Sequence, residues 1–183
     1  MALFLASGAA MFIMPPAVSG GIIGGSMEAM ERLAEGIMSL PPLGAALFVF
    51  LNNFVVMLQM VVLGAVAGIS PMITLGINGA LVGTMAAMTA RGDLTILFLV
   101  VGTLPHGIFE LPAFLICGGM GLKLGYHCTL SPLPGYSRFG SFRLIWREIF
   151  VLLPLVAALL LVAAFVELFV TLPLAGRAAG INP

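Results

Sequence analysis

The stretch from Asp93 to Gly125, DLTILFLVVGTLPHGIFELPAFLICGGMGLKLG, decides how the rest of the sequence is interpreted. It is almost wholly apolar, yet it contains His106 and Glu110, which lie four residues apart and therefore share one face of a helix. Ionisable side chains are costly in hydrocarbon, and only a partner or a water-filled cavity makes them tolerable there. The stretch therefore predicts a membrane helix that carries a polar pair.

This helix is too long to cross a membrane without distortion. As one straight helix, residues 94–125 would extend about 48 Å, whereas the core of a bilayer is roughly 30 Å thick. Gly102 and Pro105 mark the expected kink or break. Two arrangements stay open, namely one kinked span, or a re-entrant half-helix over residues 94–102 followed by a full span from His106. In the second, the irregular backbone would have to be buried in protein or line water.

The composition of the whole chain indicates a membrane protein. The 183 residues are 61% hydrophobic and 8% charged, whereas about a quarter of the residues of a soluble domain are charged. Several uncharged runs exceed the roughly 20 residues that a transmembrane helix needs. We therefore predict an all-α, polytopic transmembrane bundle that forms a single domain. Its five expected spans cover residues 2–25, 43–68, 71–90, 94–125 and 149–172.

The N-terminal run has no Lys or Arg before its apolar part, which argues against a cleaved signal peptide. We expect a first membrane helix that is kinked at Pro15 and Pro16. Two amphipathic segments, Ser26–Leu40 and Ser137–Phe150, adjoin the spans and are expected to lie at the membrane surface. A solvated linker helix is an equal alternative for the first of them. The second carries Trp146, a residue typical of the headgroup level.

Two turns are predicted from capping residues. Ser70 and Pro71 are typical of an N-cap followed by the first helical position, so the second and third spans should be antiparallel neighbours. Asp93 is the expected N-cap of the fourth span.

The spans also contain polar and small residues in a pattern typical of helix contacts. Polar side chains in hydrocarbon need internal partners, so we expect several of them to meet between the second, third and fourth spans. Whether the more distant Gln59 and Glu167 join them stays open. The predicted polar cluster consists of Asn52, Asn53, Asn78, His106 and Glu110. The glycines predicted to let helices approach closely are Gly64, Gly68, Gly79, Gly83, Gly118, Gly121 and Gly125.

The order of these residues resembles the stage II sporulation protein M family of membrane proteins. The matching elements are the pair Asn52 and Asn53 with the glycines that follow, NGALVG at 78–83, and LPHGIFELP at 104–112. They extend over about residues 48–125, and the HGxxE element between prolines is the most specific. The resemblance implies a bundle of about five helices. It also implies a membrane component that works with peptidoglycan-degrading partners in spore formers, and no catalytic residues carry over from it.

Three functions are compatible with these features. The first is a non-enzymatic scaffold or component of a membrane complex, with membrane or cell-envelope proteins as partners and the polar cluster as structural glue. The second is a small ion or solute transporter in which His106 and Glu110 bind a cation or relay a proton. The third is an intramembrane enzyme or metal site, which the sequence favours least.

Several classes of function receive no support from the sequence. His106 and Glu110 supply two metal ligands, whereas a zinc site needs three or four, and His127 is expected in a loop. The sequence contains no HExxH, nucleophile-elbow or phosphate-loop motif. The formal net charge of zero gives no basic surface for nucleic acid. We therefore expect no enzymatic activity, no metal, no cofactor and no nucleic-acid partner.

Orientation and assembly follow from the charges and the glycines. Five spans would place Lys123, Arg138, Arg143 and Arg147 on one side, and Arg32, Arg91 and Arg177 on the other. The positive-inside rule then predicts a cell-membrane protein with a cytoplasmic N-terminus. If one glycine face is used inside the bundle, the other is free to meet a second copy, which predicts a homodimer.

Overall fold

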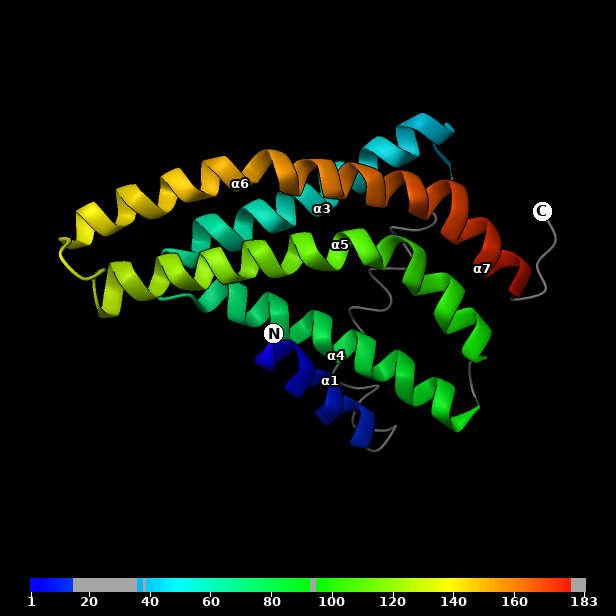
Figure 1. Ribbon diagram of the computed structural model, residues 1–183. Coiled ribbons are helices and arrows are strands. Elements are labelled where there is room, and N and C mark those ends of the chain that lie inside the picture. Colours follow the sequence, from blue (N-terminus) through cyan, green and yellow to red (C-terminus); the bar gives the residue numbers. More distant parts are fainter. Residues whose placement is uncertain (15–35, 38, 93–94, 179–183) are drawn as a thin grey trace.

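Helix α5 (Ile96–Gly125) lies at the centre of a helical bundle (Figure 1). It contacts α3 (Pro42–Gly64), α4 (Ile69–Arg91) and α6 (Arg138–Val166). The computed structural model describes residues 1–14, 36–37, 39–92 and 95–178. Within these residues the chain is all-helical, and four helices are long and apolar enough to cross a membrane. The predicted all-α membrane architecture is therefore confirmed.

The remaining elements are short. Helix α1 (Ala2–Ile13) begins the chain, the π-helical turn η1 (Tyr126–Leu130) extends α5, and η2 (Glu167–Thr171) and α7 (Leu172–Ala178) extend α6. The continuous helical segments run over Ile96–Leu130 and Arg138–Ala178. Most of the predicted surface helix at Ser26–Leu40, and residues 15–25 of the predicted first span, lie outside the described residues.

Helix α5 bends and does not break. Pro105 and Pro112 both lie inside it, and the part nearer its N-terminus turns away from the axis of the rest (Figure 1). A proline removes one backbone hydrogen bond and crowds the preceding turn. The packing of α7 on the N-terminal part of α5 supports the helix across this defect. Of the two predicted arrangements, the structure therefore shows the kinked span, and the re-entrant half-helix is not present.

The caps of two helices differ from the predicted ones. Helix α5 is capped by Thr95, whose hydroxyl accepts a hydrogen bond from the backbone N–H of Phe98 at 3.2 Å. Asp93, the predicted cap, lies outside the described residues. Helix α4 begins after Gly68, which has a left-handed φ of 72°, so Ser70 lies inside the helix. Glycine is favoured there because it adopts positive φ without steric cost.

Helices α3 and α5 pack with their backbones in close contact. A Cβ atom on Gly64 would lie 2.6 Å from the Cα of Gly121, and one on Gly121 would lie 2.5 Å from the carbonyl oxygen of Met60. A Cβ on Gly125 would likewise collide with the backbone of Gly64 and Gly68. These glycines, predicted as packing residues, therefore hold the α3–α4 turn against the end of α5.

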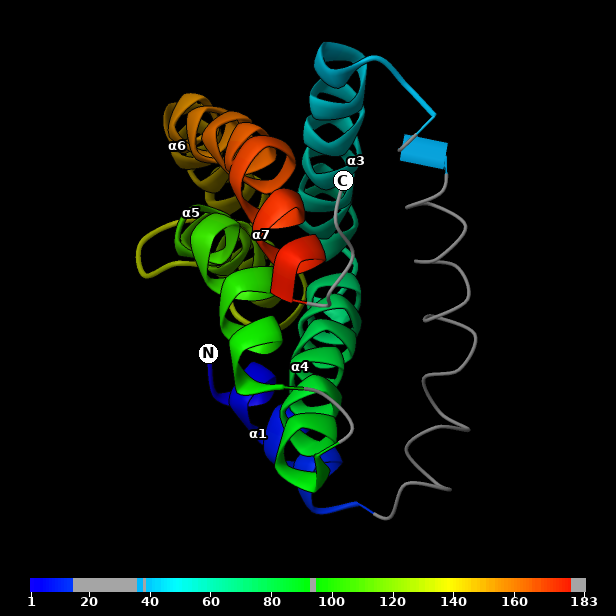
Figure 2. The same ribbon diagram turned by 90° about the vertical axis from the view of Figure 1, so that its right-hand side faces the viewer.

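The second glycine face is also used inside the chain. Gly79 and Gly83 of α4 lie against the backbone of α1, at Phe4 and Gly8. The carbonyl of Met14 accepts a hydrogen bond from Arg91 at 2.8 Å, so α1 and α4 run in the same direction. Figure 2 shows α1 at the opposite edge of the bundle from α6. Both glycine faces are thus covered within one chain. The homodimer was predicted on the assumption that one of these faces is free, and the structure leaves neither of them free.

Helix α1 is shorter than a membrane span. At 1.5 Å per residue, its 12 residues extend about 18 Å, against roughly 30 Å of bilayer core. It lies beside the C-terminal half of α4, because its contacts run from Gly79 to Arg91.

Helix α6 includes the predicted amphipathic segment. The helix begins at Arg138, capped by Ser137, whose side chain accepts a hydrogen bond from Gly140 N at 3.1 Å. It continues without interruption into the last predicted span. Ile145 and Ile149 are buried, while Arg143 and Arg147 are exposed, as the periodicity indicated. The segment is therefore the start of the long helix and not a separate surface helix.

The close contact at Gly121 leads to a stability prediction. Gly121→Ala should lower the free energy of unfolding by about 1–3 kcal/mol, because the new methyl group meets the backbone of α3 and cannot be accommodated by a side-chain rotation. The measurement is thermal unfolding in detergent. Gly119→Ala is the matched control, because nothing lies within 4 Å of a Cβ at that position of the same helix. Equal melting temperatures for the two variants would contradict the prediction.

Candidate functional site

A polar cluster lies where α5 meets η2. The Nδ1 atom of His106 is 3.3 Å from the hydroxyl of Thr171, within hydrogen-bonding distance. The Nε2 atom of the same ring is 3.9 Å from the carboxylate of Glu110, one turn further along α5. The side chains of His106 and Glu110 are 17% and 30% exposed, and Thr171 is buried at 3%. The histidine thus connects a carboxylate on its own helix to a hydroxyl on the neighbouring one.

Glu167 brings a second carboxyl group to this cluster. It lies at the start of η2, four residues before Thr171, and close enough to Glu110 for their charges to interact. Two negative charges in a poorly hydrated site repel each other, so a proton, a cation or a protonated histidine has to compensate one of them. We define Glu110, Glu167, His106 and Thr171 as the α5–η2 cluster.

The local backbone explains why these side chains meet. Between Glu167 and Thr171 the chain forms a π-helical turn inside an otherwise continuous helix. Such turns occur often at functional sites. Because the i→i+5 turn changes the angular position of the residues that follow it, it influences which side chains of the helix face α5.

The other predicted polar residues do not join this cluster. The amide of Asn78 donates a hydrogen bond to the carbonyl of Thr74 at 2.9 Å, within its own helix. Asn52 and Gln59 are exposed and Asn53 is half-buried. In the described part of the chain, none of the side-chain hydrogen bonds joins these residues to His106 or Glu110. The cluster therefore lies between the fourth and last spans, not between the second, third and fourth.

Thr171 was not singled out in the sequence, because a threonine in an apolar helix is common and usually bonds its own backbone. One available signal was the spacing of Glu167 and Thr171, which are four residues apart, as are His106 and Glu110. Two such pairs on antiparallel helices can oppose each other. Spacing does not reveal which pair faces which.

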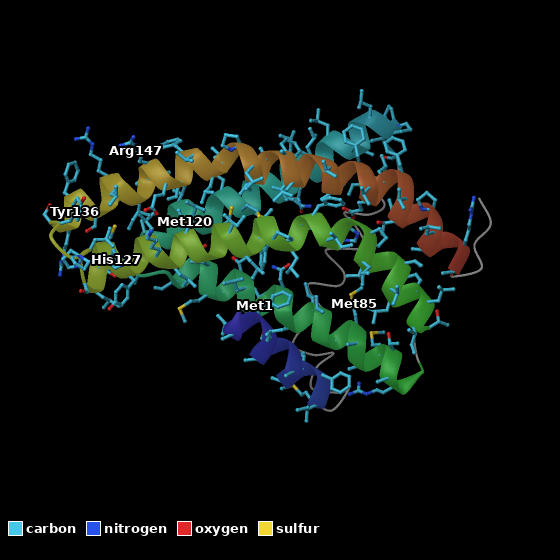
Figure 3. All side chains as sticks on the ribbon, viewed as in Figure 1. Met1, Met85, Met120, His127, Tyr136 and Arg147 are labelled. Atoms are coloured by element: carbon cyan, nitrogen blue, oxygen red, sulfur yellow. The ribbon has the colours of Figure 1, made fainter. Side chains whose placement is uncertain are left out.

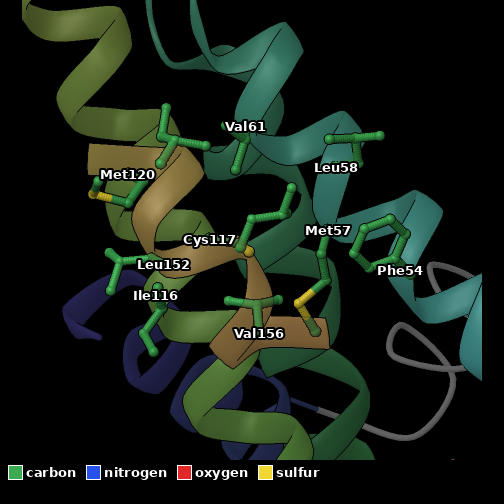
Figure 4. A pocket seen from close by; sticks show the side chains of 11 residues that line it. Phe54, Met57, Leu58, Val61, Ile116, Cys117, Met120, Leu152 and Val156 are labelled. Carbon is green, nitrogen blue, oxygen red and sulfur yellow. The ribbon is translucent and has the colours of Figure 1, made fainter. Parts of the chain in front are cut away.

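A small, partly open pocket of the bundle is apolar. A cavity of about 20 Å³ lies between α3, α5 and α6, and Met57, Cys117 and Val156 are among its lining residues (Figure 4). The volume would accommodate about one water molecule, but a buried water needs two to four polar partners. The lining offers only apolar side chains and the thiol of Cys117. This cavity is therefore a packing defect and not a binding site for a polar ligand.

An ion pair and a buried serine fix the opposite end of the bundle. Lys123 of α5 lies 2.5 Å from the carboxylate of Glu148 on α6, and both side chains are partly exposed. Ser141 is fully buried, and its hydroxyl accepts a hydrogen bond from Leu133 N and donates one to the carbonyl of Ser137. The loop between α5 and α6 is thereby tied to the start of α6.

The described residues contain no group of three or more His, Cys, Asp or Glu side chains arranged to hold a metal ion. The α5–η2 cluster offers one imidazole, one hydroxyl and two carboxyl groups. Such a set can hold a proton or form an internal hydrogen-bond network.

Comparison with known proteins identifies the relatives of the chain. The sequence model of the family described as stage II sporulation protein M matches residues 1–172. An uncharacterized protein of Methanocaldococcus jannaschii is 32% identical over 123 residues, which are 66% of this chain and 67% of that protein. No solved structure matches the chain.

The contact between His106 and Thr171 can be tested by removing the hydroxyl. Thr171→Val should lower the free energy of unfolding by about 1–3 kcal/mol, because it leaves the partly buried imidazole nitrogen of His106 without its hydrogen-bond partner. Thermal unfolding in detergent measures the effect. Thr84→Val is the control, since the hydroxyl of Thr84 only donates to the carbonyl of Ala80 in its own helix. A Thr171 variant as stable as the control would show that the contact contributes nothing.

Proposed function

Because the chain belongs to the stage II sporulation protein M family, we propose that it is a non-enzymatic component of a membrane complex that holds partner proteins at the membrane. The supporting observation is the way in which the interior is filled. Helices α3, α4 and α5 meet through Gly64, Gly121 and Gly125 and through large buried side chains such as Met60 and Leu75. A bundle packed in this way suits a rigid platform.

The α5–η2 cluster has a structural role in this proposal. The hydrogen bond between the imidazole of His106 on α5 and the hydroxyl of Thr171 on η2 helps to fix the relative position of the two segments. In model systems such interhelical hydrogen bonds contribute about 1 kcal/mol each. Protonation of one of the two carboxyl groups would let the cluster persist without charge repulsion.

Transport of a proton or cation is the second candidate, and the convergence of two carboxyl groups favours it. Transporters bind ions at polar residues of distorted helices near the middle of the membrane. Glu110 lies on the bent helix α5, and Glu167 begins the π-helical turn η2 that packs against it. Against this candidate, the pocket between α3, α5 and α6 is apolar and has a volume of only about 20 Å³.

The substitution Glu110→Gln separates the two candidates. An amide keeps the size and the hydrogen-bonding groups of the side chain but cannot ionise. For a structural cluster, Glu110→Gln should keep the melting temperature within a few degrees and should support growth of a strain that lacks the wild-type gene. Glu110→Ala should lower the free energy of unfolding by about 1 kcal/mol, because it removes the carboxyl group that lies 3.9 Å from the Nε2 atom of His106 and leaves a space in the cluster.

Proteoliposomes containing a pH-sensitive dye provide the second measurement. We expect no difference in proton or cation flux between the wild type and Glu110→Gln. A flux in the wild type that Glu110→Gln abolishes, in a variant of normal stability, would replace the scaffold by a transporter. A Glu110→Gln variant of normal stability that fails to support growth would also indicate a transporter.

We further propose a cytoplasmic location for the end of the bundle that carries the loop between α5 and α6. Lys123, Arg138, Arg143 and Arg147 gather at this end, whereas Arg91 and Arg177 lie at the opposite end (Figure 1). The excess of positive residues supports this orientation by the positive-inside rule. A location in the cell membrane is part of the same proposal. The predicted cytoplasmic N-terminus is not, because α1 lies beside the half of α4 that ends at Arg91 and does not reach the end of the bundle that carries the loop.

Topology reporters can test the orientation. A reporter that is active only in the cytoplasm should be active when inserted at Gly135 and inactive when fused after Ala178. Replacing Arg138, Arg143 and Arg147 by Glu should invert or scramble these signals, because each Lys or Arg near the surface contributes about 1 kcal/mol of attraction to anionic lipid. The triple change of Glu28, Glu31 and Glu35 to Lys is the comparison, and an equal response to both would refute the proposed orientation.

A further inference from the structure

The outer side of α6 near its start carries two parallel rows of side chains. Phe142, Trp146 and Phe150 are spaced by four residues, and their rings contact one another with centroids 5.9 Å and 5.6 Å apart. Beside them, Arg143 and Arg147 form a second row with the same spacing. A shallow hollow on the surface is lined by both rows and by Val151. We call it the aromatic–arginine hollow.

The charge of this hollow is not neutralised by the protein. Arg143 and Arg147 are exposed and take part in none of the ion pairs among the described residues. The neighbouring acid, Glu148, lies 2.5 Å from Lys123 of α5 and is therefore already paired. Figure 3 shows Arg147 directed away from the bundle. Two guanidinium groups one helical turn apart are consequently free to bind an anion.

The order of the groups along the helix matches the order of the parts of a phospholipid. The arginines come first from the end of the bundle, and Phe150 and Val151, which are 64% and 72% exposed, follow towards the middle of α6. A headgroup phosphate is held well by the planar fork of an arginine, often through two parallel hydrogen bonds. Apolar side chains beyond the headgroup level meet acyl chains. A soluble anion would contact only the two arginines and not the apolar side chains that follow them.

We propose that the aromatic–arginine hollow binds one anionic phospholipid, whose phosphate contacts Arg143 and Arg147 and whose acyl chain lies along Phe150 and Val151. The aromatic row holds the helix face rigid, since Phe142 and Trp146 also pack against the core. The lipid occupies a defined position and is not merely attracted to a diffuse positive surface. This site lies at the end of the bundle opposite the α5–η2 cluster (Figure 1).

Native mass spectrometry can test the site on the full chain in detergent. The protein is mixed with equal amounts of phosphatidylglycerol and phosphatidylcholine that carry the same acyl chains. The wild type should bind phosphatidylglycerol preferentially. The variant R143Q/R147Q should lose roughly tenfold or more of that preference, because it removes two positive charges that each contribute about 1 kcal/mol of attraction to a lipid of net negative charge, whereas the trimethylammonium group of phosphatidylcholine already cancels the charge of its phosphate.

The matched control is R138Q/R177Q, which removes the same number of charges from exposed positions outside the hollow. It should keep the preference of the wild type. Phe150→Ala should weaken the binding of both lipids and leave their ratio unchanged, because it removes only an apolar contact. The single variants R143Q and R147Q give the same test if the double variant does not fold.

Three results would overturn the proposal. The first is a wild type without preference for phosphatidylglycerol. The second is an R143Q/R147Q variant that retains the preference. The third is an equal loss in R138Q/R177Q, which would mean that the attraction depends on total charge and not on this hollow.

Discussion

The bundle depends on the close approach of the backbones of α3 and α5. At Gly64 and Gly121 even a methyl group would meet backbone atoms of the other helix. In a membrane, helices gain little from the hydrophobic effect when they associate, because lipid tails are as apolar as leucine side chains. Close backbone contact supplies dispersion instead, and it requires residues without side chains. The large buried residues Met60, Leu75 and Leu124 then fill the space around these contacts.

The same constraint explains why the glycines are distributed over two faces. Gly64, Gly121 and Gly125 join the α3–α4 turn to α5, while Gly79 and Gly83 receive α1. Each face is used by the chain itself. A second copy would therefore have to bind through another surface, and the sequence does not distinguish a glycine face that is used internally from one that is free.

Much of the fold could be predicted from the sequence because length and hydrophobicity specify spans directly. The four long helices and the glycine contacts at Gly121 and Gly125 followed from these patterns. The partner of His106 did not follow, because the sequence gives the face of each helix but not which faces oppose each other across the bundle. Thr171 and Glu167 come from the last span, and a π-helical turn changes the ordinary spacing there. The sequence left open whether α5 is kinked or broken at Pro105, since the support for a bent helix comes from α7 and not from the helix itself.

Helices α5 and α6 are fixed to each other at two distant points, and this pairing has a consequence for the polar cluster. At one end Lys123 binds Glu148, and at the other His106 meets Thr171. More residues separate Glu148 from Thr171 on one side than His106 from Lys123 on the other. The π-helical turn lies at the C-terminal end of the first, longer stretch. The contact of Lys123 with Glu148 and that of His106 with Thr171 thus both form, although α5 is bent and a π-helical turn follows α6. A shift of α6 along α5 would separate the imidazole from the hydroxyl before it disturbed the apolar packing, because hydrogen bonds depend on distance and angle more steeply than apolar contacts do. The geometry of the cluster therefore depends on how α5 and α6 are aligned. This is true whether the cluster stabilises a rigid platform for partner proteins or binds an ion.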